Sequence, residues 1–357
     1  MTMTMTTTTG IKASASLPRY FTIGALILSF ALATSAFTFF GRTQEQGAPN
    51  LLAVGLLGFV LFMMINYVTS RSIEGRRKAT DRMVTGWVTG AISLALIPLV
   101  SLTWTVVEKG INRLDVEFFT LTMRNVVGPG GGALHAIVGT LELTAIATLI
   151  SVPIGIMTAI YLVEYGRGRI AKAVTFFVDV MTGIPSIVAG LFAFSLFLIL
   201  LGPASAINGM AGAIALAVLM TPVVVRATEE MLKIIPNELR EASYALGIPK
   251  WLTIVKVVIP TALAGIATGI IISIARIIGE TAPLLLAAGF TTSMNFDPLS
   301  EKMMTLPVFV YTSYAIQGTD VQSYVDRAWA GALTLMIIVM VLNLVARIIS
   351  TLFSPKG

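Results

Sequence analysis

The chain has 357 residues, of which 56% are hydrophobic and only 12% are charged, and its mean hydropathy is +0.88. Soluble globular domains carry about 25% charged residues. The composition therefore excludes an ordinary soluble domain and indicates a membrane protein. The chain has no cysteine, which excludes a disulfide framework, a thiolate nucleophile and a thiol metal site.

Eight long apolar runs follow one another along the chain. Each is about 20 residues or longer, the length of helix that crosses a hydrocarbon core about 30 Å thick. We therefore expect an all-α polytopic membrane protein with eight spans. These spans cover residues 20 to 40, 51 to 69, 84 to 107, 136 to 162, 173 to 200, 207 to 226, 262 to 290 and 328 to 351.

The runs fall into three expected regions. Residues 1 to 19 begin with the low-complexity run MTMTMTTTTG, which predicts a disordered tail. Residues 20 to 82 are expected to form an N-terminal transmembrane hairpin followed by a basic linker. Residues 83 to 357 hold the other six spans as one transmembrane domain. We find no internal repeat, which gives little support to a secondary transporter built from inverted repeats.

The distribution of Lys and Arg predicts the orientation, because basic residues in short loops stay on the cytoplasmic side. With residues 1 to 19 in the cytoplasm, 17 of the 24 basic residues fall on that side and six fall outside. The remaining one, Arg276, lies within the seventh span. Both termini are therefore expected in the cytoplasm, and orientation explains the net charge of +6 without a nucleic-acid partner.

The cytoplasmic loop after the sixth span, residues 236 to 260, reads PNELREASYALGIPKWLTIVKVVIP. It predicts a helix over 238 to 246, with Asn237 as N-cap and Gly247 in the left-handed C′ position. So short a helix is marginal in water by itself, so we expect another protein to pack against it. The face expected to make that contact is small and apolar, and it consists of Leu239, Ala242, Ser243 and Leu246.

This loop resembles the EAA loop shared by the permeases of bacterial ABC importers. The positions that match the pattern are Glu241, Ala242, Gly247, Val257, Ile259 and Pro260. Ser243 stands where the pattern has its second alanine. The alternative interpretation, a surface turn between two spans, does not account for this spacing.

The resemblance implies a coupling helix that fits a cleft in a separate ATPase subunit. The residues implied in that contact are Glu241, Ala242, Ser243, Leu246 and Gly247. The chain has no GxxxxGK[ST] sequence, so we expect ATP and Mg²⁺ to be bound by the partner. No cofactor, metal site or catalytic residue is expected in this chain.

The seventh span contains the string ARIIGETAPLLLAAG, residues 275 to 289. Arg276 and Glu280 are four residues apart, which places them on one helix face, where an ion pair can form. A charge at mid-membrane costs about 2.5 to 3.5 kcal/mol on insertion scales. Such residues are therefore expected to face the bundle interior or an aqueous cavity. The pair by itself leaves two interpretations open, a structural ion pair and a substrate site.

The string ARxxGETAPLL resembles the phosphate-specific permeases PstA and PstC, and its TAPLL ending is closer to PstA. Five further strings in this chain agree with PstA, so the resemblance covers about residues 120 to 351. They are GGALHAIVGTL at 131 to 141, PIGIMTAIYLVEY at 153 to 165, GIPSIVAGLF at 183 to 192, MTLPVFVY at 304 to 311 and RAWAGALTL at 327 to 335. The hairpin lies outside the region of resemblance.

The resemblance implies the permease subunit of an ATP-driven phosphate importer in the bacterial plasma membrane. Its implied partners are a PstC-like permease, a PstB-like ATPase dimer and a PstS-like phosphate-binding protein. Arg276 is implied in phosphate translocation, because a guanidinium offers planar paired donors to an oxyanion. Glu280 would orient that guanidinium in the empty site and repel the anion enough for release. Further candidates for the pathway are Thr281, Ser186 and Thr182.

Three alternatives differ in function. A permease for another oxyanion, such as molybdate or sulfate, is disfavoured by the GETAP string. A phosphate-signalling scaffold would keep the contact with the ATPase but would not transport. An integral-membrane enzyme would need clustered intramembrane His, Asp or Ser, whereas the chain has the single histidine His135, to which we assign no role.

Overall fold

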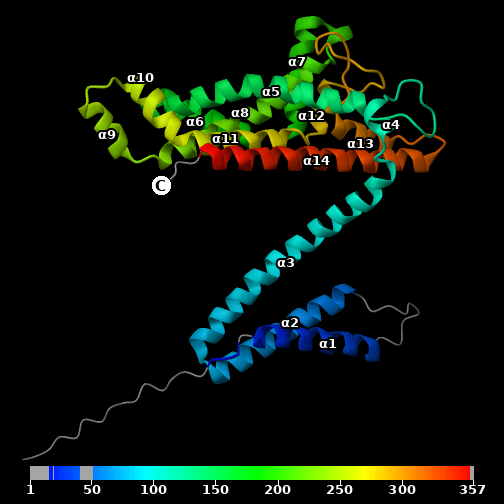
Figure 1. Ribbon diagram of the computed structural model, residues 1–357, viewed down its shortest axis with the longest axis vertical. Coiled ribbons are helices and arrows are strands. Elements are labelled where there is room, and N and C mark those ends of the chain that lie inside the picture. The colour runs from blue at the N-terminus through cyan, green and yellow to red at the C-terminus, as the bar shows by residue number, and fades with distance from the viewer. Residues whose placement is uncertain (1–15, 19, 41–50, 354–357) are drawn as a thin grey trace, which may run out of the picture. The chain divides into compact units, whose positions relative to one another are not determined.

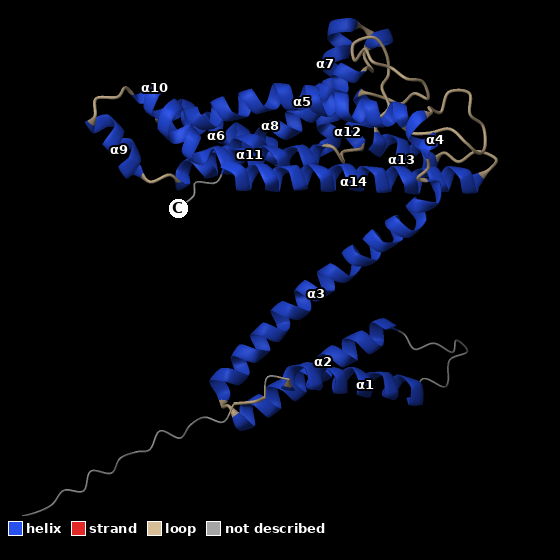
Figure 2. Ribbon diagram, viewed as in Figure 1, coloured by secondary structure: helices blue, strands red, loops and turns tan. Residues whose placement is uncertain are grey.

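The computed structural model describes residues 16 to 18, 20 to 40 and 51 to 353. Within these ranges all regular elements are helical, as Figure 2 shows, which confirms the expected all-α class. Except for residues 16 to 18, the tail expected over residues 1 to 19 lies outside the described residues.

The chain divides into two compact units, residues 1 to 103 and residues 104 to 357. The first unit contains α1 (Phe21–Phe40), α2 (Leu51–Ile73) and most of α3 (Arg76–Gly110). The helices α1 and α2 lie side by side as a hairpin (Figure 1). The start of α3 packs on α2, where the Phe59 and Trp87 rings meet edge to face with centroids 5.2 Å apart.

The second unit is a bundle of long helices and short connecting segments. In this bundle α5 packs along α8, α8 along α11, and α11 along α14, while α7 contacts α8 and α12. Its elements are η1 (Ile111–Arg113), α4 (Val116–Thr120), α5 (Leu134–Ile160), η2 (Tyr161–Tyr165), α6 (Gly168–Thr182), α7 (Ser186–Leu201), η3 (Pro203–Ser205), α8 (Gly209–Ile234), α9 (Asn237–Ala245), α10 (Lys250–Thr253), η4 (Ile254–Val258), α11 (Ile259–Ile277), α12 (Ala282–Ala287), α13 (Leu306–Ala315) and α14 (Val321–Phe353).

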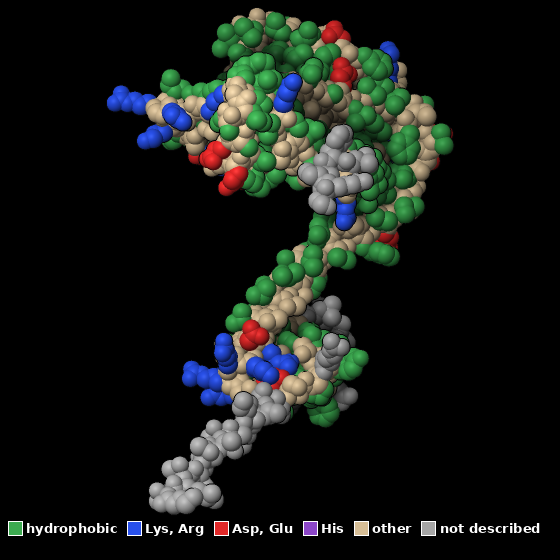
Figure 3. Space-filling view, turned by 60° about the vertical axis from the view of Figure 1, so that its left-hand side comes forward, with side chains coloured by type: hydrophobic (Ala, Val, Ile, Leu, Met, Phe, Trp, Pro, Cys, Tyr) green, Lys and Arg blue, Asp and Glu red, His purple; other side chains and the backbone are tan. Residues whose placement is uncertain are grey.

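Seven helices in the described part of the chain are long and apolar enough to cross a membrane. The number is eight if α6 and α7, which meet at 108°, form one span, so the expected count of spans agrees with the structure. Hydrophobic side chains cover most of the surface in Figure 3, and basic side chains project at one end of the second unit. In a membrane protein, such an apolar surface faces lipid.

Two of the expected spans differ from straight helices. The fifth, expected over 173 to 200, turns sharply at residues 183 to 185. Pro185 has no N–H and disfavours helical geometry in the residue before it. The seventh, expected over 262 to 290, breaks after α11, and the short α12 follows it. Pro283 in the first turn of α12 lacks the N–H that would continue the α11 hydrogen-bond ladder.

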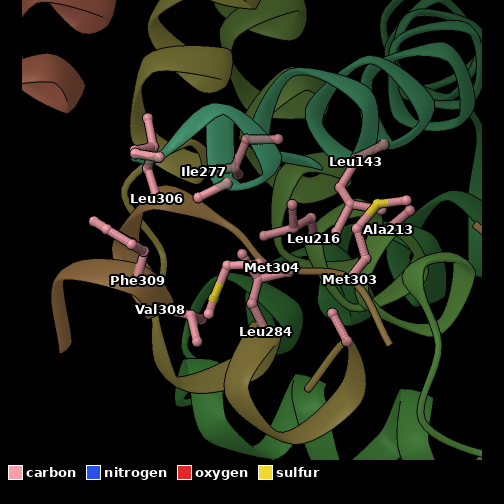
Figure 4. Packing of buried hydrophobic residues seen from close by; sticks show 14 of the residues in the cluster. Leu143, Ala213, Leu216, Ile277, Leu284, Met303, Met304, Leu306, Val308 and Phe309 are labelled. Atoms are coloured by element: carbon pink, nitrogen blue, oxygen red, sulfur yellow. The ribbon is translucent and has the colours of Figure 1, made fainter. Parts of the chain in front are cut away.

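The core of the second unit lies where α5, α8, α12 and α13 meet (Figure 4). Leu143, Leu216 and Leu284 are buried there, each 2% exposed or less. A Cβ added at Gly139 would lie 2.1 Å from the carbonyl oxygen of Met304. Glycine is therefore what lets α5 approach the chain this closely, as small residues do at membrane helix interfaces.

Candidate functional site

The expected coupling loop forms α9 and α10 at one end of the second unit (Figure 1). The helix α9 begins at Asn237, with Pro236 as its N-cap, so the prediction of Asn237 as N-cap is wrong by one residue. Pro236 has φ −58° and ψ 141°, outside the helical region, and Asn237 is the first helical residue. Gly247 has φ +76°, which confirms the left-handed C′ position.

Most of the expected contact face of α9 points away from the bundle. Leu239 and Ala242 are exposed, and Leu246 is 80% exposed. Ser243 is an exception, because it is buried and its hydroxyl lies 2.8 Å from the hydroxyl of Thr253 in α10. The prediction that Ser243 shares the exposed face is therefore wrong. The hydrogen bond of Ser243 instead joins α9 to α10.

Arg276 lies in the last turn of α11 with an exposed side chain. The predicted ion pair with Glu280 is wrong. Among the described residues neither side chain takes part in a hydrogen bond or ion pair, and α11 ends at Ile277. Glu280 follows in the break between α11 and α12, so the four-residue spacing no longer places the two on one helix face.

The hydroxyl candidates lie around the contact between α7 and α12. A Cβ added at Gly190 of α7 would lie 2.6 Å from Cα of Pro283 in α12. Ser186 is one helical turn before Gly190, and Thr281 is the N-cap of α12. Both are half-buried. In the described structure no hydrogen bond joins either hydroxyl to Arg276.

Thr182, the remaining pathway candidate, donates to the carbonyl of Val178 one turn back at 2.9 Å. This back-bond satisfies its hydroxyl proton within α6 and leaves the oxygen free only as an acceptor. Thr182 is therefore a poorer donor to an anion than Ser186 or Thr281.

Sequence reasoning missed two groups of charges. One joins α6 to α8, where Arg226 contacts Asp179 and lies 2.6 Å from Oε2 of Glu229, which also binds Lys233. The other joins α9 to η2 through Arg240 and Glu164. An acid directly after the apolar string PIGIMTAIYLV was the available signal for Glu164, since a carboxylate at a span end needs a partner or water.

The chain is similar in sequence to known transport proteins. Residues 151 to 356 match the family described as binding-protein-dependent transport system inner membrane component. The phosphate transport system permease protein PstA 1 of Mycobacterium tuberculosis (strain ATCC 25618 / H37Rv) is 45% identical over 285 residues, 79% of this chain and 91% of that protein. The PstA of Pasteurella multocida (strain Pm70) is 41% identical over 261 residues, 72% of this chain and 90% of that protein.

The fold also resembles a solved structure. A chain of the bacterial alginate ABC transporter, solved in complex with an alginate pentasaccharide-bound periplasmic protein, aligns with a TM-score of 0.54 at 17% identity. The alignment covers 78% of this chain and 97% of that one, and it shows a shared fold. From the sequence match and the shared helical architecture, the chain belongs to the family of binding-protein-dependent transport system inner membrane components.

Proposed function

We propose that this chain is the PstA-type permease subunit of an ATP-driven phosphate importer in a bacterial plasma membrane. The observation that carries the proposal is the 45% identity over 285 residues to a phosphate transport permease. Both termini and α9 lie in the cytoplasm, as the distribution of basic residues favours. The chain performs no chemistry of its own.

The substrate-binding residue is Arg276. Its guanidinium is exposed, and no acid in the described structure occupies its donors. Phosphate carries one to two negative charges near neutral pH, and a guanidinium matches two of its oxygens with paired N–H groups. Thr281 and Ser186 add hydroxyl donors along the pathway. Glu280, in the break that follows α11, adds a negative charge that favours release of the anion, because like charges repel.

The subunit works within a larger assembly. A PstC-like permease completes the pathway, and a PstS-like protein delivers phosphate from outside. Two PstB-like ATPase subunits bind ATP and Mg²⁺, and one of them contacts the exposed face of α9. Closure of the ATPase dimer moves α9, opens the pathway outward and exposes Arg276 to delivered phosphate, and hydrolysis reverses the movement.

The test is uptake of labelled phosphate by the reconstituted complex, with and without ATP. Replacing Arg276 by Gln removes the charge but keeps a side chain of similar length. A hydrogen bond to a charged group is worth about 1.5 to 3 kcal/mol, so we expect uptake to fall about 10- to 100-fold while assembly and ATP hydrolysis persist. Arg124→Gln is the matched control, because this exposed arginine makes no side-chain hydrogen bond or ion pair in the described structure.

The outcomes separate the alternatives. Uptake that Arg276→Gln leaves unchanged would reject the role of Arg276. ATP-dependent uptake of sulfate or molybdate in preference to phosphate would indicate a different oxyanion permease. A wild-type complex that assembles and hydrolyses ATP but takes up no oxyanion would favour a signalling scaffold.

A further inference from the structure

Arg240 in the first turns of α9 donates four hydrogen bonds inside the chain and forms an ion pair with Glu164. Its Nε and Nη2 lie 3.0 and 2.9 Å from Oε1 of Glu164. Its Nη2 also donates to the carbonyl of Leu232 at 3.0 Å, and its Nη1 donates to the carbonyl of Ile235 at 2.8 Å. A fifth contact joins Nη1 to Oδ1 of Asn237 at 3.4 Å. All three guanidinium nitrogens therefore donate to groups within the chain.

Glu164 is buried and Arg240 is largely shielded from solvent, although both lie at the edge of the bundle. The side chains are 12% exposed for Arg240 and 5% for Glu164. Leu232 lies in the last turn of α8 and Ile235 is its C-cap, so the positive group also covers the carbonyl end of α8, which carries partial negative charge. One side chain thus links three elements, α9, η2 and the end of α8.

Glu164, the partner of Arg240, lies in a π-helical turn and not in a regular α-helix. This turn, η2, follows directly after the last residue of α5. A π turn holds one residue more than an α turn and rotates the following side chains, and such turns occur often at functional sites. A second π-helical turn, η4, joins α10 to α11. The two segments η2 and η4, both of which contact α9, are therefore π-helical turns and not regular α-helix.

Lys250 completes the connection from the other side of the loop. Its Nζ donates to the backbone carbonyl of Glu164 and lies 4.9 Å from the centre of the Tyr165 ring. Together with the bond between Ser243 and Thr253, this holds α9 and α10 against η2. The exposed face of α9 remains free for a partner.

We propose that Arg240 and Glu164 are positioning residues that make α9 move as one body with the inner ends of α5 and α8. This inference rests on the proposed function, in which α9 contacts the ATPase. A nine-residue helix is marginal by itself, so a loosely held α9 would shift without moving the bundle. The pair carries displacement of α9 into α5 and α8, which pack along each other through the core.

The experiment compares Glu164→Gln and Arg240→Lys in the complete reconstituted complex. Gln keeps the size of Glu164 but removes its charge, and Lys keeps the charge of Arg240 but loses the planar fork. We expect assembly and ATP hydrolysis to persist while phosphate imported per ATP falls about 2- to 30-fold, the range that coupling residues without ligand contact produce. The matched controls are Glu230→Gln and Arg169→Lys, two exposed residues without a contact in the described structure.

A second measurement reports on α9 directly. The chain has no cysteine, so Glu238→Cys offers a single site for a spin label in the exposed first turn of α9. In the full chain in lipid nanodiscs, we expect the label to become more mobile with Glu164→Gln or Arg240→Lys and to stay unchanged with the controls. This measurement needs neither phosphate nor ATPase.

Three results would overturn the inference. The first is wild-type uptake per ATP and wild-type label mobility in both variants. The second is an uptake loss that matches lost ATPase binding in both variants. The third is failure of even the charge-conserving Arg240→Lys chain to assemble, which would make the pair a folding requirement. A wild-type complex without phosphate uptake would instead reject the proposed function, and label mobility would still decide whether the pair holds α9.

Discussion

Glu74, in the turn between α2 and α3, is a single carboxylate that gathers several donors. It accepts hydrogen bonds from the backbone N–H of Leu17 at 2.9 Å and the Ser70 hydroxyl at 2.9 Å, and Nε of Arg82 lies 2.8 Å away. The Leu17 N–H, followed by Arg82 and Ser70, lowers the pKa of Glu74 from 4.5 to about 2. Donors that bind the ionised form favour it over the protonated form.

This lowered pKa predicts a pH dependence of stability in the first unit. A depressed carboxyl pKa contributes stability that is fully present above pH 4.5, the ordinary value, and is lost as pH falls toward about 2. We therefore expect wild type to unfold at a higher temperature than Glu74→Gln at pH 7. The difference should shrink to about half at pH 3. Thermal unfolding in detergent measures it.

The control for this prediction is Asp81→Asn. Asp81 is exposed in the same region, and the described structure gives its side chain no contact. The temperature difference between wild type and this variant should stay small at every pH. A difference between wild type and Glu74→Gln that stays constant from pH 7 to pH 3 would contradict the assignment.

Arg276 shows what residue spacing alone predicts and what it does not. Its cost in lipid singles it out from the sequence as a residue expected to face a polar surrounding. The predicted ion pair with Glu280 required a continuous helix through both residues. The helix instead breaks before Pro283. The end of α11 leaves the guanidinium of Arg276 exposed and without an acid partner. Residue spacing alone does not predict where the helix ends.

At the scale of elements, the close contact between α7 and α12 depends on Gly190, which has no side chain. A methyl group at Gly190 would lie 2.6 Å from Cα and 2.9 Å from the carbonyl oxygen of Pro283, and backbone atoms cannot move aside as a flexible side chain does. We expect Gly190→Ala to destabilise the folded protein by about 1 to 3 kcal/mol, the usual cost of overpacking. A lower unfolding temperature in detergent is the measurement.

Gly55→Ala in α2 serves as the comparison, because no atom lies within 4 Å of an added Cβ there. Alanine in a helix is favoured over glycine by about 0.5 to 1 kcal/mol, so this variant should be slightly more stable than wild type. Equal effects of the two substitutions would show that helix propensity alone governs both positions.

The bend between α6 and α7 shows a second limit on what the sequence predicts about the helices. Gly183 and Pro185 lie at the break between α6 and α7, within the fifth expected span. The angle of 108° depends on how α7 packs against α8 and α12, which are distant in sequence. Local chemistry therefore locates a bend, and packing sets its direction.

At the scale of the whole molecule, the proposed orientation is open to a direct test. Because the chain has no cysteine, Leu246→Cys and Phe296→Cys each introduce one thiol at an exposed position, 80% and 70% exposed in the wild-type side chain. A membrane-impermeant maleimide added to intact spheroplasts should label Phe296→Cys only. In inside-out vesicles it should label Leu246→Cys only. The reverse pattern would place α9 outside and would exclude contact with a cytoplasmic ATPase.

By itself, the sequence determined the all-helical membrane class, the number of candidate spans and the place of the short helix α9. These depend on apolar length, basic residues and caps, all of which act within a few residues of the chain. Only the tertiary structure decided that Ser243 faces inward, that Arg276 stands apart from Glu280 and that Arg240 holds Glu164. The contacts of Ser243 and Arg240 depend on where separate segments meet, because a buried polar group takes whichever partner the packed fold brings within hydrogen-bonding distance. The separation of Arg276 from Glu280 depends on the residue at which α11 ends.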